Sequence, residues 1–125
     1  MKAMFPTLLL SLATTLAPAI LPAQEEVSQG GGAVLRSLDK VNGEVVDLEL
    51  IDGQEAVVGS IAIELDECRY PAGNPAGDAY AYLVIRDTAN PEPPAFSGWM
   101  VASSPALNAL DHSRYDVWVL RCTTS

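Results

Sequence analysis

The residues best suited to chemistry lie close together near the end of this chain. His112 is its only histidine, and Ser103, Ser104 and Asp111 precede it by a few positions. In a Ser-His-Asp triad the histidine removes a proton from the serine, and the three side chains come from separate elements. Sequence neighbours rarely meet this geometry, and the Gly-x-Ser-x-Gly turn of many hydrolases is missing. We therefore predict no catalytic residue, with a hydrolase-type enzyme around His112 as the weakest alternative.

The cysteines indicate a covalent link rather than a reactive site. Cys68 and Cys122 are the only two, and an even pair in an oxidising compartment is most simply a disulfide. The alternative is a redox-active or metal-binding pair, but neither cysteine has a second one at a Cys-x-x-Cys spacing. Other candidate ligands, among them His112 and Met100, show no spacing typical of a metal site. We predict no metal and no cofactor.

Aromatic side chains offer a binding surface. Most tyrosines and both tryptophans lie in the later part of the chain, and such side chains anchor interfaces or stack on sugars when several are exposed together. Alternation along 80–86 places Tyr80, Tyr82 and Arg86 on one face of a strand. The predicted binding residues are Trp99, Tyr80, Tyr82 and Arg86.

Trp118 is expected to lie inside the domain instead. In a domain this small, most large aromatic side chains are needed for packing. Strict alternation gives Trp118 the same face as Leu120 and Cys122. This predicts an interior position beside the disulfide.

The start of the chain predicts export. Lys2 precedes a short apolar run at 8–13, and small residues follow at 17–19 and at Ala23. This order is typical of a cleavable signal peptide, which we assign to residues 1–23. An uncleaved anchor is disfavoured by Pro6, Pro18 and the shortness of the apolar run, so we expect no stable membrane anchor after cleavage. The polar, glycine-rich residues 24–32 predict a flexible spacer, and residues 33–125 predict a single domain.

The charge balance excludes one class of partner. The net charge is −9, and all sixteen carboxylates follow the predicted signal peptide. Such a surface repels phosphate backbones, so we expect no nucleic-acid partner.

Hydrophobic alternation predicts an all-β domain. Strands are expected at 34–38, 46–50, 61–65, 80–85, 96–101 and 116–122, with a turn typical of hairpins at Asp52-Gly53. Ser104-Pro105 predicts a short helix, with Leu107 and Leu110 facing inward. Several short strands with turn signals between them indicate a small β-sandwich or barrel with one short helix and one disulfide.

The later half of the chain also resembles a known family. Residues 96–100 read Phe-Ser-Gly-Trp-Met and 102–107 read Ala-Ser-Ser-Pro-Ala-Leu, followed by His112, Tyr-Asp-Val-Trp-Val at 115–119 and Cys122. These residues resemble the DUF2155 family of small exported alphaproteobacterial proteins. The match extends upstream through 38–40, Gly43, 59–68 and 79–83. Ser113 stands where the family pattern has proline, which changes the turn rather than any chemistry.

The resemblance implies the periplasm of a Gram-negative bacterium, paired cysteines and no recognised cofactor. Family members are often encoded near an accessory subunit of respiratory NADH:ubiquinone oxidoreductase, which implies service to a membrane complex. We therefore expect a non-catalytic binding or accessory module whose partner is a periplasmic or membrane protein. The alternative is a small-ligand or glycan-binding module that uses exposed aromatic residues.

Overall fold

The computed structural model describes residues 4, 6–7, 9–14 and 25–124, and its regular structure consists of β-strands alone. The predicted signal peptide falls mostly on positions outside the described residues. Within the described part, no helix is long and apolar enough to cross a membrane. The strands are β1 (Val27–Gln29), β2 (Gly32–Asp39), β3 (Val45–Ile51), β4 (Glu55–Val58), β5 (Ile61–Pro71), β6 (Tyr80–Asp87), β7 (Phe96–Val101) and β8 (Tyr115–Thr123).

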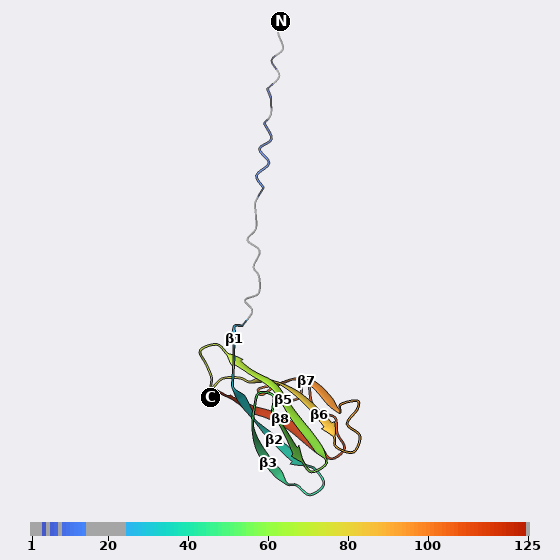
Figure 1. Cartoon of the computed structure of the whole chain (residues 1–125). Helices are drawn as coiled ribbons and strands as arrows, with labels where there is room; N and C mark the ends of the chain where they lie inside the picture. Colours follow the sequence, from blue (N-terminus) through green and yellow to red (C-terminus); the bar gives the residue numbers. More distant parts are fainter. Residues whose placement is uncertain (1–3, 5, 8, 15–24, 125) are drawn as a thin grey trace.

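These strands form two antiparallel sheets (Figure 1). The larger sheet has the order β1-β5-β6-β7, and β4 also pairs with β5. β4 pairs with the first residues of β5, and β1 pairs with its last residues. The smaller sheet has the order β3-β2-β8.

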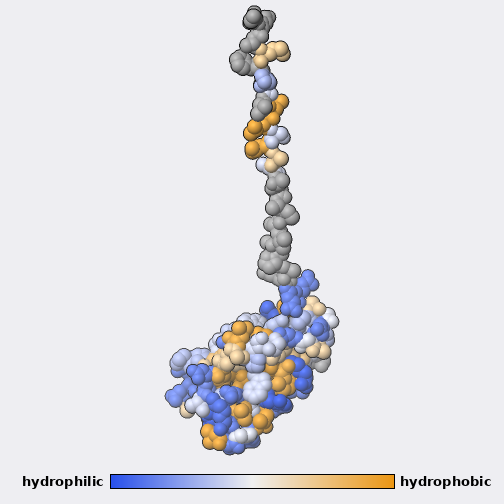
Figure 2. Space-filling model, turned by 180° about the vertical axis from the view of Figure 1, so that it is seen from behind, coloured by the Kyte–Doolittle hydropathy of each residue, from blue (hydrophilic) through white to orange (hydrophobic). Residues whose placement is uncertain are grey.

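One hydrophobic core lies between the sheets. Leu35 and Val119 from the smaller sheet belong to the same buried cluster as Ile63, Leu65 and Leu83 from the larger one. The last three side chains are fully buried, because alternate residues of a strand point to the same face. The prediction of an all-β domain is confirmed. Apolar surface also remains outside the core, as patches between hydrophilic ones (Figure 2).

A disulfide joins the two sheets. Cys68 lies in β5 and Cys122 in β8, with their Cα atoms 5.6 Å apart. Both cysteines are buried. The predicted disulfide is therefore confirmed, and its place in the fold is to tie the larger sheet to the smaller one.

The predicted helix at Ser104-Pro105 is wrong. The chain makes two consecutive turns there, in which Ser104 N donates to Val101 O and Leu107 N donates to Ser104 O. Leu107 is 75% exposed, and only Leu110 is buried. A helix this short is unstable unless packing supports it. Here the loop is instead anchored on β7 by the Asn108 amide, which donates to the Trp99 carbonyl at 2.9 Å.

The predicted spacer at 24–32 is ordered from Val27 onward. β1 occupies 27–29, and β2 begins at Gly32. Between them, Gly30 N donates to Cys68 O in the larger sheet, and Gly31 N donates to Thr123 O in the smaller one. The glycines thus carry the chain from one sheet to the other in close contact with both. A flexible spacer is the wrong interpretation of this segment, because glycine also suits a close backbone approach.

Trp118 does not lie in the interior. Leu35 pairs with Val119 and Val34 with Arg121, which leaves Leu120 as an extra residue in β8. This bulge shifts the alternation by one residue. Cys122 therefore shares the buried face of Val119, and Trp118 is half-buried on the other side.

The turn at Asp52-Gly53 connects the two sheets instead of closing a hairpin. Gly53 has a φ of +83°, as tight turns often require. The strand before this turn is β3 and the strand after it is β4, which belong to different sheets. The hairpin lies one strand later, where Gly59 (φ +56°) and Ser60 join β4 to β5. β3 and β4 therefore both lie at sheet edges.

Candidate functional site

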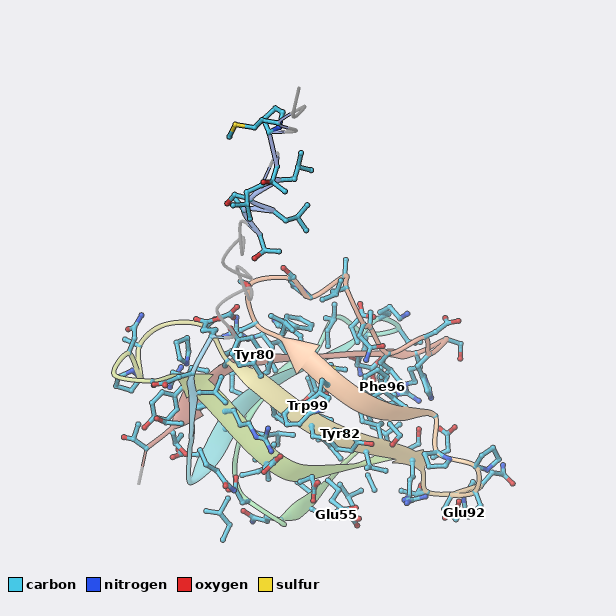
Figure 3. The ribbon with its side chains drawn as sticks, turned by 90° about the horizontal axis from the view of Figure 1, so that it is seen from above. Glu55, Tyr80, Tyr82, Glu92, Phe96 and Trp99 are labelled. Carbon is cyan, nitrogen blue, oxygen red and sulfur yellow. A yellow bond between two sulfur atoms is a disulfide. The ribbon has the colours of Figure 1, made fainter. Side chains whose placement is uncertain are left out.

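Three of the predicted binding residues meet on the face of the larger sheet that points away from the core. Buried and half-buried residues alternate along β6, which places Tyr80 and Tyr82 opposite its core side chains. In the antiparallel pair of β6 and β7, Tyr82 lies directly across from Trp99. Tyr80, Trp99 and Tyr82 lie close together over these two strands (Figure 3). The sheet register, rather than proximity in sequence, assembles this group.

The group forms a packed cluster with an arginine. The rings of Tyr82 and Trp99 meet edge to face, with centroids 5.4 Å apart. The guanidinium carbon of Arg69 lies 5.1 Å from the Trp99 ring centroid, within range of a cation–π interaction. Tyr82 and Arg69 thus both restrict the indole. We call Trp99, Tyr82, Tyr80 and Arg69 the aromatic cluster.

A shallow hollow of about 280 Å³ borders the cluster, lined by Val27, Arg69, Tyr80 and Trp99. The Tyr80 hydroxyl donates to Glu25 Oε2 at 3.1 Å. Partial burial, and next the neighbouring Glu25 carboxylate, raise the pKa of Tyr80 above its usual value. Tyr80 is thus a neutral hydrogen-bonding group at the rim of the hollow.

Arg86 does not belong to the cluster. Its Nη1 donates to Glu92 Oε1 at 2.7 Å and to the Pro91 carbonyl at 3.2 Å. Glu92 lies well away from Trp99 and Tyr80 (Figure 3). Arg86 shares the outward face of β6, as the alternation predicts, but it anchors the loop after β6.

The cluster member Arg69 and the neighbouring Val27 were not predicted from the sequence. Arg69 follows Cys68, whose disulfide must lie inside, so its own side chain must point outward. That signal was present in the sequence. Val27 carried no such signal, because it reaches the hollow only through the pairing of β1 with the end of β5.

Carboxylates dominate the rest of this face. Glu67 accepts a hydrogen bond from Arg69 at 2.6 Å. Glu55 in β4 lies directly opposite Glu64 in β5, and neither forms an ion pair with any residue in 25–124. Like charges directly opposite in a sheet destabilise it. The outward face thus combines an aromatic cluster with uncompensated negative charge.

Both ring nitrogens of His112 form hydrogen bonds within the fold. Its Nδ1 accepts hydrogen bonds from the backbone N–H groups of Arg114 (3.0 Å) and Tyr115 (3.2 Å), so this nitrogen carries no proton. The proton therefore sits on Nε2, which donates to Asp87 Oδ1 at 2.9 Å. Both ring nitrogens are engaged in tying the start of β8 to the end of β6. No serine contacts either of them among the described residues.

Ser103 is tied to a different carboxylate. Its hydroxyl donates to Asp78 Oδ2 at 2.6 Å, and its backbone N–H donates to Asp78 Oδ1 at 2.9 Å. Burial raises the pKa of Asp78, but the hydrogen bonds from Ser103 and Ala79 lower it by more. Asp78 therefore stays ionised and joins the loops that precede β6 and follow β7. The structure does not bring Ser103 and His112 together as a catalytic pair.

The two neighbouring serines give a matched test of this interpretation. Ser103→Ala removes a hydrogen bond to an ionised group, and we expect it to lower the free energy of unfolding by about 1 kcal/mol. Ser104→Ala is the control, because its hydroxyl forms no hydrogen bond with any residue in 25–124, and we expect a change near zero. Urea unfolding followed by circular dichroism measures both values. An equal loss of free energy of unfolding in the two variants would contradict a stabilising hydrogen bond from Ser103 to Asp78.

No group of three or more possible metal ligands comes together within the described residues.

The family relationship rests on a comparison with known proteins. A family model described as "Uncharacterized protein conserved in bacteria (DUF2155)" matches residues 33–122. The chain belongs to the DUF2155 family. This match begins within β2 and ends at Cys122, so it spans both cysteines of the disulfide.

A curated relative supports the same family. An uncharacterised protein of Rickettsia prowazekii is 30% identical to the chain over 88 residues, which is 69% of this chain and 57% of the relative. The DUF2155 chain thus spans little more than half the length of that protein. No solved structure matches the chain. The aromatic cluster of this DUF2155 domain lies within the matched segment, apart from its neighbour Val27.

Proposed function

We propose that this DUF2155 protein is a non-catalytic binding module of the periplasm that docks an envelope or membrane protein through the aromatic cluster. In this proposal the two sheets form a β-sandwich, and the outward face of the larger sheet is the docking platform. The predicted signal peptide and the disulfide between Cys68 and Cys122 support an oxidising, exported location.

The observation that carries the proposal is the cross-strand packing of Trp99, Tyr82 and Arg69 on the outward sheet face. Tryptophan, tyrosine and arginine are the residues that most often dominate the free energy of protein–protein binding. The cluster is already packed, so binding would cost little side-chain entropy. This favours a protein partner that contacts a rigid surface.

The charges on the same face support a basic partner. Glu55 and Glu64 repel one another across the strands, and neither forms an ion pair with a cation within residues 25–124. The two arginines of this face, Arg69 and Arg86, are already paired with Glu67 and Glu92. Lysine or arginine side chains of a partner would relieve this repulsion and speed association by electrostatic steering.

A glycan partner fits the same surface less well. Sugar binding by stacking needs an open face of an aromatic ring. Arg69 lies over the Trp99 ring, and Tyr82 packs against it edge to face. The hollow beside Tyr80 remains open to a small ligand, so a glycan is the second outcome that the following experiment distinguishes.

The test is affinity purification of the tagged protein from gently solubilised envelopes, with quantitative mass spectrometry. We expect one membrane or periplasmic protein to be enriched, and Trp99→Ala to weaken its binding by about 2 kcal/mol, or thirtyfold. Trp118→Ala is the matched control, because Trp118 is half-buried on the outside of the other sheet. The proposal would be overturned if the Trp99→Ala variant captured the partner as well as the original protein does. It would also be overturned if the protein bound a glycan and no protein partner.

A further inference from the structure

We propose that the free edge of β3 is a separate interaction surface, which binds an extended basic segment of a partner protein as an added β-strand. This surface goes beyond the docking role of the aromatic cluster, since it lies on the other sheet. The surface combines an unpaired strand edge, a cleft beside that edge and a pattern of negative charge along it.

β3 is one of the two edge strands of the smaller sheet. Among the described strands it pairs only with β2, and β4, which follows it in the chain, pairs with β5 instead. Figure 1 shows β3 at the outer side of its sheet. Edge strands usually carry lysine, proline or a bulge that prevents further pairing. The sequence of β3, Val-Val-Asp-Leu-Glu-Leu-Ile, contains neither residue, and its pairing with β2 is regular along its full length.

A cleft of about 320 Å³ lies beside this edge. Its apolar wall includes Val46 and Leu48 of β3 and Val58 of β4. The Ser37 hydroxyl also lines it, and this buried oxygen has no hydrogen-bond partner among the residues that the structure describes. A strand added to β3 would place every second side chain over the cleft. Small apolar side chains would complete the wall, and a polar group among them would satisfy Ser37.

Exposed apolar side chains flank the same edge. Val45 and Ile51 at the two ends of β3 are 54% and 63% exposed, and Val57 of β4 is 63% exposed. Together with Val41 in the turn before β3, they are four of the six large apolar residues exposed within 25–124. This concentration on one side of the domain indicates a surface that a partner covers.

The charges on β3 select the partner. Asp47 and Glu49 point outward between Val45 and Ile51. Pairing of β3 with β3 of a second copy, centred on Leu48, would set Asp47 directly opposite Glu49, which is unfavourable. Arg36 binds Asp47 at 2.7 Å, whereas Glu49 forms no ion pair with the described residues. A strand with lysine or arginine on its outward face and apolar residues on its inward face matches this edge.

The test uses the isotope-labelled full chain and a synthetic peptide of about nine residues that alternates lysine with valine and leucine, long enough to cover β3. We expect its addition to shift the amide NMR signals of Val45–Ile51. Glu49→Lys should weaken binding roughly tenfold, since it replaces an attraction by a repulsion, and should admit the matching peptide with glutamate in place of lysine. Asp111→Lys, at an exposed position in the loop between β7 and β8, is the control and should leave binding unchanged.

Four results of the peptide experiment would overturn the proposal. These are no binding at millimolar peptide, equal binding of a peptide with the same residues in blocks, shifts centred on Trp99, or affinity unchanged by Glu49→Lys. Self-association of the chain through β3 would also contradict it, because the occupant would then be a second copy. If the peptide does not bind β3, the proposed role of the aromatic cluster still stands, because the peptide and pull-down experiments probe different sheets.

Discussion

Replacing Cys68 and Cys122 together by alanine is expected to lower the free energy of unfolding by about 4 kcal/mol. The disulfide closes a loop with a sequence separation of 54 residues, and the entropy lost by the unfolded chain on closing such a loop corresponds to roughly that value. A domain of this size retains only about 5–10 kcal/mol in total. The bond also joins the sheets, so its loss removes the covalent link across the core.

Urea unfolding of the two forms, followed by circular dichroism, measures this difference. The unmodified protein under reducing conditions is the control, because it loses the same link without any change of side chain. We expect its midpoint to fall close to that of the double variant. A loss below about 1 kcal/mol would show that the packing of the two sheets, rather than the disulfide, holds the domain together.

Gly32→Ala is expected to cost about 3 kcal/mol, which is large for the addition of one methyl group. A Cβ at this position would overlap the backbone carbonyl oxygen of Leu50, and it would also press on Ile51 and Thr123. Backbone atoms of two paired strands cannot move aside as a flexible side chain can. The strands β2, β3 and β8 must therefore separate locally to admit the methyl group.

Gly43→Ala is the matched control for this prediction. Gly43 has a φ of +77° but no atom within 4 Å of an added Cβ, so the expected cost is only about 1 kcal/mol, from backbone strain. Thermal unfolding of both variants gives the comparison. If the two variants lose the same free energy of unfolding, the prediction fails. Residues 30–32 would then be the flexible spacer that their composition suggests, and they would not pass closely between the sheets.

The strands with a strong internal pattern were predictable from the sequence. Ile61, Ile63 and Leu65 alternate with polar residues, and all three are fully buried. The same reasoning located β2, β3, β6, β7 and β8. β1 and β4 were not predicted, because each is too short for a pattern and exists only through pairing with β5. The prediction of a short helix was wrong because it relied on a local capping signal, and contacts of the loop with β7 outweigh that signal.

The candidate site shows the same division. Alternation along β6 was enough to place Tyr80 and Tyr82 on one outward face, as the structure has them. Their contact with Trp99 and Arg69 depends on how β6 pairs with β7 and β5. The assignment of Trp118 failed because one extra residue at Leu120 shifts the alternation, and a bulge depends on the partner strand rather than on the strand itself.

The all-β class, the disulfide and the faces of the longer strands follow from the amino-acid sequence, because each depends on local alternation or on the identity of a few residues. The order of the strands, the close passage of Gly30 and Gly32 between the sheets and the contacts within the aromatic cluster are visible only in the folded protein. Hydrogen bonds between strands join residues far apart in the chain, and a period of two indicates which face a side chain takes but not which strand lies beside it.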